Sequence, residues 1–330
     1  MTIVLHIGFT KTGSSALQYG FERNAAALAR AGIHYAPGAV SALSAAGHIT
    51  SGNGGPLARY LVPSKRPAGY DPAAFPATFA RIYLSSGLPT TLISSEALSL
   101  ATPEMLVRFR DEVAGDRPLV VVALIRDLYG HARSAWMQGI KRHATVRSFD
   151  EFLARAERPP QVMQLRAYTE ALGRETIRLL HYESVRADLF GAFLGALGAT
   201  VPDIDTSLPA INRSLSPVEA EVLRACNAVH RDPALSRLVS DRLIERYPDR
   251  PTAAAVDPAH VARLAERYAE DLAWVNDTYF GGEPVLGIAG PARPAEADPV
   301  TTDAVWADVV ATLVEALHRD APAAEQRRKR

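Results

Sequence analysis

The first residues of the chain contain the feature that most constrains its fold. Residues 2–7, TIVLHI, form a short apolar run with β-branched members, which is typical of a buried strand. The run ends at Gly8, where the segment GFTKTGSS has a G-x-x-x-x-G pattern followed by two hydroxyl residues. From Ser14 to Gly32 the apolar residues recur at helical spacing. The chain is therefore predicted to begin with a strand, a glycine loop and a helix, an arrangement that can hold an anion.

The position of lysine distinguishes this loop from that of a nucleotide triphosphatase. A triphosphatase carries lysine directly after the second glycine, where it reaches the β and γ phosphates, and the next hydroxyl holds Mg²⁺. Here Ser14 occupies that position, and the lysine of the loop is Lys11. A phosphosulfate suits the loop better, because the sulfuryl group carries one negative charge rather than two. Lys11 would stabilise the charge that develops on the leaving phosphate.

Three further apolar runs are predicted to be strands, at 90–95, 118–125 and 176–182. Helical patterns separate them, so the sequence predicts an α/β fold of the P-loop type, with three α/β/α layers and a mostly parallel central sheet. Ligands on such sheets bind at the carboxyl ends of the strands. The residues expected at those ends are Gly8 and its successors, Glu96, Arg126 and Tyr182.

The C-terminal part of the chain is predicted to be helical. We predict one domain over 1–282, in which the Gly- and Pro-rich insertion 34–89 and the helices of 216–282 shape an acceptor pocket. The expected segments after it are a Pro/Ala-rich linker over 283–300, an amphipathic helix over 301–319 and a disordered tail over 320–330.

Charge and composition exclude several classes of protein. The chain has 36 basic and 36 acidic residues, so it has no strong field for a nucleic-acid backbone or an anionic membrane surface. A single cysteine, Cys226, excludes an intramolecular disulfide and a cysteine-based zinc cluster. We find neither a signal peptide nor an apolar run approaching ~18 residues. We therefore expect a cytoplasmic protein without a membrane span, and its oligomeric state stays open.

The segment HIGFTKTGSSALQ resembles the 5'-phosphosulfate loop of sulfotransferases that use 3'-phosphoadenosine 5'-phosphosulfate (PAPS), whose pattern is roughly P-K-[ST]-G-[ST]-[ST]. Thr10 replaces the usual proline. The residues that match the pattern position by position are Lys11, Thr12, Gly13, Ser14 and Ser15. The resemblance implies that these residues hold the phosphosulfate.

The segment LIRDLYGHARSAWMQ resembles the second signature of the same family, the 3'-phosphate site. In that signature an arginine at a strand end precedes a serine on the next helix by eight residues. Arg126 and Ser134 keep this spacing, although Leu128 replaces a frequent proline and His131 a frequent arginine. The resemblance therefore implies that Arg126 and Ser134 bind the 3'-phosphate. The structural alternative for Arg126 is an ion pair with Asp127 or another acid.

Two weaker resemblances concern the rest of the nucleotide. HYES is similar to a strand-end Tyr-Glu that lies near the adenine, which nominates Tyr182. INRSLSPVEAEVLRACN is similar to a segment common in bacterial members. It implies that Asn212, Arg213 and Ser214 close over the nucleotide. Ala16 stands where the animal cytosolic enzymes have an adenine-stacking tryptophan, so the stacking residue is not identified.

Sulfuryl transfer to a hydroxyl requires a base that removes its proton. Glu96 directly follows a predicted strand at the ligand-binding edge, and the heparan-type branch of the family uses a carboxylate. His48 lies in the glycine-rich insertion and has a near-neutral intrinsic pKa, and cytosolic members use a histidine. Each has a structural alternative: Glu96 caps the following turn or pairs with an arginine, and His48 is an ordinary surface residue.

The leading hypothesis is a metal-independent sulfotransferase with PAPS as co-substrate and 3'-phosphoadenosine 5'-phosphate (PAP) as product. Its acceptor would be a hydroxyl, less readily an amine, of a carbohydrate or another small molecule. Two alternatives stay open: a P-loop kinase or nucleotide hydrolase, and a nucleotide-binding module without catalytic activity. The sequence does not identify the acceptor.

Overall fold

The computed structural model describes residues 1–9, 12–37, 52–202, 204–206, 213–250, 252, 256–289 and 300–328, with the backbone alone for 316–328. The chain divides into two compact units in place of the single domain predicted over 1–282, and each unit has its own hydrophobic cluster. Unit 1 comprises Met1–His131, Arg158–Ile211 and Leu264–Gly290. Unit 2 comprises Ala132–Glu157, Asn212–Arg263 and Pro291–Arg330.

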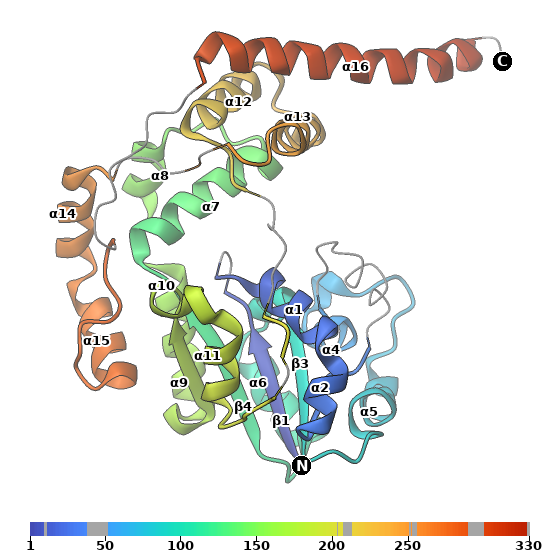
Figure 1. Cartoon of the computed structure of the whole chain (residues 1–330), viewed down its shortest axis with the longest axis vertical. Coiled ribbons are helices and arrows are strands. Elements are labelled where there is room, and N and C mark those ends of the chain that lie inside the picture. Colours follow the sequence, from blue (N-terminus) through green and yellow to red (C-terminus); the bar gives the residue numbers. More distant parts are fainter. Residues whose placement is uncertain are drawn as a thin grey trace. The chain divides into compact units, whose positions relative to one another are not determined.

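Unit 1 contains a five-stranded sheet with the order β2-β3-β1-β4-β5 (Figure 1). The strands are β1 (Thr2–Ile7), β2 (Ile33–His34), β3 (Thr90–Ser95), β4 (Leu119–Ile125) and β5 (Ile177–His181). All neighbouring pairs are parallel. β1, β3 and β4 are buried along almost their whole length, as continuous apolar runs in a sheet covered on both faces should be. The predicted α/β fold is confirmed, with a fully parallel sheet.

The crossover connections after β1 and β3 run in opposite directions. α1 (Ser14–Arg23) and α2 (Ala25–Arg30) lead from β1 to β2, whereas α6 (Pro103–Phe109) leads from β3 past β1 to β4. Because parallel crossovers are right-handed, these helices cover opposite faces of the sheet (Figure 1). α4 (Gly55–Leu61) and α9 (Pro160–Leu172) both contact α6. The shorter α5 (Phe75–Phe79) contacts α4.

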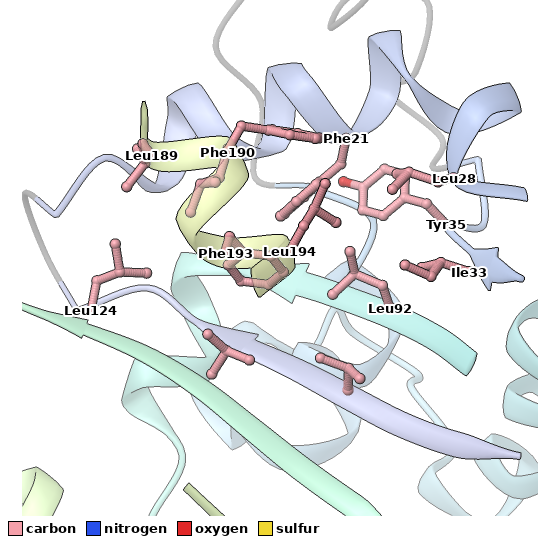
Figure 2. Close-up of a cluster of buried hydrophobic side chains, with 13 residues drawn as sticks. Phe21, Leu28, Ile33, Tyr35, Leu92, Leu124, Leu189, Phe190, Phe193 and Leu194 are labelled. Carbon is pink, nitrogen blue, oxygen red and sulfur yellow. The ribbon is translucent and has the colours of Figure 1, made fainter. Parts of the chain in front are cut away.

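The face covered by α1, α2 and α11 (Leu189–Ala196) carries the hydrophobic cluster drawn in Figure 2. The ring centroid of Phe21 lies 5.3 Å from that of Phe190, 4.8 Å from that of Phe193 and 5.5 Å from that of Tyr35. The buried sheet residues of the cluster are Val4, Ile33, Leu92, Val122 and Leu124. Aromatic side chains bury large apolar areas, so this cluster holds α1, and the loop that precedes it, against the sheet.

The helix predicted from Ser14 to Gly32 is interrupted at Asn24. The Nδ2 of Asn24 donates to the carbonyl oxygens of Gly20 and Asp205, at 2.9 Å each, and its Oδ1 accepts from the Asp205 N–H at 2.8 Å. Asparagine often ends a helix in this way, because its side chain competes with the backbone for hydrogen bonds. The sequence analysis did not predict this break or the two-residue strand β2 that follows α2.

Residues 285–288, VLGI, which we call the strap, are ordered although they fall in the predicted linker 283–300. Leu286 and Ile288 are buried. The carbonyl oxygens of Gly287 and Ile288 accept from the N–H groups of Leu128 and Tyr129, at 3.1 and 2.7 Å. These are the first residues of α7 (Leu128–His143), whose initial N–H groups have no acceptor within the helix. The strap therefore belongs to unit 1, which corrects the linker prediction.

Unit 2 is helical in the residues that the structure describes, which confirms the predicted helical C-terminal part. Its hydrophobic cluster includes Trp136 of α7 and residues of three helices that pack on one another: α12 (Pro217–His230), α13 (Pro233–Arg246) and α16 (Thr302–Arg328). The other helices are α8 (Phe149–Arg155), α14 (Pro258–Arg267), which continues into unit 1, and α15 (Ala269–Phe280), which lies wholly in unit 1.

α16 extends past the predicted helix 301–319 and reaches Arg328, so it includes most of the expected tail 320–330. The sequence of 320–328, DAPAAEQRR, consists mainly of Ala, Glu, Gln and Arg, which are strong helix formers. Among the helices that the structure describes, α16 included, none has both the length and the hydrophobicity needed to cross a membrane.

Candidate functional site

The carboxyl ends of four strands meet at one edge of the sheet in unit 1. In the parallel ladders Ile7 pairs with both Ser95 and Ala123, and Ile125 pairs with His181. The segments that follow β3, β1, β4 and β5 therefore start side by side, in that order. Because the crossovers diverge after β1 and β3, this edge contains a topological switch point, where α/β sheets bind their ligands.

Thr12 and Gly13 hold the shape of the loop after β1. Thr12 is fully buried, and its Oγ1 donates to the carbonyl oxygen of Phe9 at 2.6 Å. Gly13 has a φ of 83°, in the left-handed region that favours glycine. α1 begins at Ser14, so the N–H groups of its first turn point toward the loop. Lys11 lies outside the described residues, and its role stays a prediction.

A buried hydroxyl lies beneath the loop. Ser14 is 6% exposed, and its Oγ has no hydrogen-bond partner among the described residues. The Oγ is so close to Gly8 that a Cβ on Gly8 would overlap it. Burial of an unpaired hydroxyl costs about 1–3 kcal/mol, and an anion held by the loop would remove that cost. Ser14 therefore fits an anionic ligand, and the half-buried Ser15 follows it in the same turn.

Glu96 lies next to this loop, directly after β3. Its Cα is 3.7 Å from the position of a Cβ on Gly8, and its side chain is exposed. The turn that Glu96 begins is capped by Ser95, whose Oγ accepts from the Ala97 N–H at 3.2 Å. None of the ion pairs formed by the described residues includes Glu96. Among the described residues, Glu96 therefore neither caps this turn nor pairs with an arginine, its backbone lies next to the loop, and its role as the base stays a prediction.

Arg126 directly follows β4 and forms an ion pair with Glu183. The Nε of Arg126 donates to Oε1 of Glu183 at 3.2 Å, and the two side chains are 20% and 22% exposed. The guanidinium also faces an aromatic ring, with its Cζ 5.5 Å from the ring centroid of Tyr182. The alternative to nucleotide binding, an ion pair with Asp127 or another acid, is thus realised with Glu183.

Beyond the ion pair lies a network of charged groups that includes His181. Its Nε2 lies 3.1 Å from Oδ1 of Asp127 and 3.2 Å from Oε2 of Glu183, and its Nδ1 lies 2.7 Å from Oγ of Ser184. Burial lowers the pKa of His181, but the hydrogen bonds and charges of the two carboxylates outweigh burial and raise this pKa to about 9. His181 is therefore a cation at neutral pH.

Glu183 is the anion that connects the two cations of this network. Burial raises the pKa of Glu183, but the hydrogen bonds from His181 and the Asp127 N–H, together with the charge of Arg126, lower this pKa below its usual value. The Asp127 N–H donates to Oε2 of Glu183 at 3.1 Å. Glu183 is therefore held from two sides, by Arg126 at one oxygen and by His181 and Asp127 at the other.

Asp127, His181 and Glu183 also satisfy the spacing of a metal site, because their ligand atoms lie within 4.8 Å of one another. Each of these atoms has a hydrogen-bond partner. Oδ1 of Asp127 accepts from the Gly287 N–H of the strap at 3.0 Å, and Nε2 of His181 bonds to the two carboxylates. Hydrogen bonds thus account for the cluster, and the expectation that the site needs no metal stays a prediction.

Tyr182 connects the loop after β1 with Arg126. It begins the short helix α10 (Tyr182–Val185) after β5. A Cβ on Gly13 would lie 3.0 Å from Cε2 of Tyr182 and 2.7 Å from Cδ2 of Leu189. The same tyrosine ring lies 5.5 Å from Cζ of Arg126. One aromatic ring therefore reaches from the anion-binding loop to the arginine at the end of β4.

Residues 11, 48 and 212 (Lys11, His48 and Asn212) fall outside the described parts of the chain. Ser134, on α7, and Ser214 are half-buried residues of unit 2. Their proposed contacts with the nucleotide stay predictions.

Arg213 is buried within unit 2. Its guanidinium is 6% exposed and donates to both carboxylate oxygens of Glu219, at 2.6 and 2.8 Å. Its other N–H groups donate to the carbonyl oxygens of Ser214, Leu243 and Tyr247. Glu219 also pairs with Arg250 at 2.5 Å. All five N–H groups of Arg213 have acceptors, so in this structure Arg213 neutralises a buried carboxylate, and its expected closure over the nucleotide stays a prediction.

The sequence analysis missed the network around Arg126. The signal available for it was HYES, in which His181 and Glu183 flank Tyr182 at a strand end, but only Tyr182 was singled out. Asp127 was expected only as an alternative ion-pair partner of Arg126. Gly287 offered no signal, because its contribution is a backbone N–H that follows Asp127 by 160 residues.

The sequence matches no protein-family model and no curated protein. Its structure aligns with that of a sulfotransferase from Alicyclobacillus acidocaldarius, at 18% identity and a TM-score of 0.41, over 72% of this chain and 99% of the other. It also aligns with a retinol dehydratase in complex with androsterone and the inactive cofactor PAP. That alignment has 14% identity and a TM-score of 0.35, over 82% of this chain and 80% of the other.

Replacement of Gly13 by alanine tests the loop geometry. Gly13→Ala forces a side chain into the left-handed region and against Tyr182 and Leu189, so we expect the free energy of unfolding to fall by about 1–3 kcal/mol. Gly195→Ala in α11 is the matched control, because a Cβ there meets open space and alanine favours a helix. Urea unfolding of both variants measures the effect, and equal stabilities would contradict this description of the loop.

Proposed function

We propose that this chain is a sulfotransferase that moves the sulfuryl group of PAPS to a hydroxyl of a small-molecule or carbohydrate acceptor. The main support for this proposal is the position of Tyr182, whose ring approaches both Gly13 of the loop and Arg126 at the end of β4. A ligand with an anionic group at each end of a nucleoside would use both places. PAPS has this form, with a 5'-phosphosulfate and a 3'-phosphate.

The loop favours a phosphosulfate over a triphosphate. A triphosphate with its Mg²⁺ needs the lysine that follows the second glycine, and Ser14 stands there. Ser14 instead offers a buried hydroxyl beneath the loop that has no partner in the described parts of the chain. Backbone N–H groups, the start of α1 and Lys11 would meet the lower charge of the sulfuryl group.

The proposed transfer is an in-line displacement at sulfur. A lone pair of the acceptor oxygen forms the new S–O bond, while the bond from sulfur to the bridging oxygen breaks and its electron pair stays on the 5'-phosphate of PAP. The acceptor proton passes to a base, and Glu96 is our leading candidate because its Cα lies next to Gly8 of the loop and its side chain is exposed. His48 stays the alternative base.

The direct test is transfer from radiolabelled PAPS to a panel of sugars, phenols and alcohols, with products identified by mass spectrometry. We expect labelled product both with and without EDTA, because none of the proposed groups requires a metal. A kinase or nucleotide hydrolase would instead act on ATP and lose activity in EDTA. Tight binding of PAP without transfer to any acceptor would favour a module that binds the nucleotide but has no catalytic activity.

Replacement of Arg126 by alanine tests the 3'-phosphate site. If Arg126 binds this phosphate, Arg126→Ala should weaken PAP by about 1.5–3 kcal/mol, or roughly 10- to 100-fold in Kd, and leave adenosine 5'-phosphate (AMP) almost unchanged. Isothermal titration calorimetry with PAP and AMP measures both affinities. Equal losses for the two nucleotides would show that Arg126 does not read the 3'-phosphate.

Replacement of Glu96 by glutamine tests the base. We expect Glu96→Gln to lower kcat roughly 10²-fold or more, with PAP affinity retained, because the amide cannot accept the proton. Two variants serve as controls: Glu170→Gln, an exposed carboxylate on α9, and His48→Asn, the alternative base. A normal rate for Glu96→Gln together with a large loss for His48→Asn would transfer the role to His48.

A further inference from the structure

The contacts of Glu183 indicate a role for this residue that neither the phosphosulfate loop nor the 3'-phosphate signature predicts. One carboxylate oxygen of Glu183 accepts from Nε of Arg126 at 3.2 Å. The other accepts from the backbone N–H of Asp127 at 3.1 Å and lies 3.2 Å from Nε2 of His181. The group that faces Arg126 is thus anchored to the backbone at the end of β4 and to a second cation.

His181 and Asp127 are themselves fixed by their neighbours. His181 is 6% exposed, with Ser184 at Nδ1 and both carboxylates at Nε2. Asp127 is 8% exposed, and its Oδ1 also accepts from the Gly287 N–H of the strap at 3.0 Å. The anchoring of Glu183 therefore extends through a buried chain of hydrogen bonds to a backbone segment whose own carbonyls bind the first turn of α7.

We propose that Glu183 is a positioning residue that holds the Arg126 guanidinium in the orientation needed to bind the 3'-phosphate of the donor, and that His181, Asp127 and the strap hold Glu183. This inference rests on the proposed function. It makes the contribution of Arg126 to 3'-phosphate recognition depend on Glu183, and through it on His181, Asp127 and the Gly287 N–H of the strap.

A competing role for Glu183 follows from its charge. A carboxylate beside Arg126 could occupy the arginine in place of the phosphate, and its removal would then strengthen nucleotide binding. Two observations favour positioning. Glu183 has partners besides Arg126 at its second oxygen, so it is held even when Arg126 bonds elsewhere. The adjacent His181 cation also offsets its charge, so its net repulsion of a phosphate is small.

The experiment measures discrimination, defined as the Kd of AMP divided by the Kd of PAP, by isothermal titration calorimetry of the full chain. The informative variants are Glu183→Gln, which keeps the shape and removes the charge, and Glu183→Asp, which keeps the charge and shortens the reach. We expect each to lower discrimination roughly 10-fold, as loss of a group that orients a binding residue does, with AMP affinity within about twofold of wild type. Glu170→Gln on α9 is the matched control and should leave discrimination unchanged.

A double-mutant cycle separates positioning from a general structural effect. If Glu183 acts through Arg126, then Glu183→Gln should have no further effect on discrimination in an Arg126→Ala background. Thermal unfolding of each variant verifies that it is folded. If Glu183→Gln does not fold, Glu183→Asp carries the same test. Increased or unchanged discrimination in the Glu183 variants would overturn the inference.

Failure of this inference is distinguishable from failure of the proposed function. Equal affinity of the wild-type chain for PAP and AMP would contradict the proposed function itself. Preference for PAP that depends on Arg126 but not on Glu183 would retain the function and reject only the positioning role.

The pH dependence of discrimination supplies a second readout. The charged groups near His181 are Asp127, Glu183 and Arg126. His131 on α7 is neutral, because burial and the charge of Arg126 lower its pKa to about 4. The His181 imidazolium is present below a pKa of about 9 and is lost above it. We therefore expect discrimination to fall as the pH rises through about 9, since Glu183 loses its cationic partner. Constant discrimination from pH 7 to 10 would remove His181 from the network.

Discussion

The parallel pairing of β1 with β3 on one side and β4 on the other determines where the proposed site residues of unit 1 lie. Val122 and Leu124 alternate along β4 and enter the cluster that also contains Phe21 and Phe193. A slip of one residue between β4 and β1 would turn both side chains out of the cluster, so apolar burial fixes the register. The same register brings the end of β4, and with it Arg126, to the edge where the loop after β1 starts.

Because the charges at this edge of the sheet are balanced, anion binding there depends more on the orientation of hydrogen-bond donors than on the net electrostatic field. The whole chain has a formal net charge of zero, and the cations Arg126 and His181 are matched by the carboxylates of Asp127 and Glu183. A neutral cluster attracts an anion only weakly at long range. Binding of an anion must therefore depend on hydrogen-bond donors that point at it. This gives a reason for several buried groups to fix the orientation of one arginine, Arg126.

The sequence predicted those parts of the fold and site that depend on local pattern. The four long strands, the glycine loop and the strand-end positions of Glu96, Arg126 and Tyr182 follow from apolar runs and the residues after them. The break at Asn24, the strap and the partners of Arg213 could not be predicted in this way. Each depends on a partner distant in sequence: Asp205 for Asn24, the first turn of α7 for the strap, and the carbonyl of Tyr247 for Arg213.

The surroundings of Asp127, like the identity of Ser14, indicate which kind of sulfuryl or phosphoryl donor this edge of the sheet suits. In a triphosphatase an acidic residue at the end of a neighbouring strand supports the metal that neutralises the phosphates. Asp127 stands near such a position, but its Oδ1 accepts from the Gly287 N–H and bonds to a protonated His181. Use of Oδ1 for Mg²⁺ would require loss of both of these partners. Two differences that follow separate strands, Ser14 in place of a lysine after β1 and the hydrogen-bonded Asp127 after β4, thus favour a donor whose transferred group, such as a sulfuryl group, needs no metal.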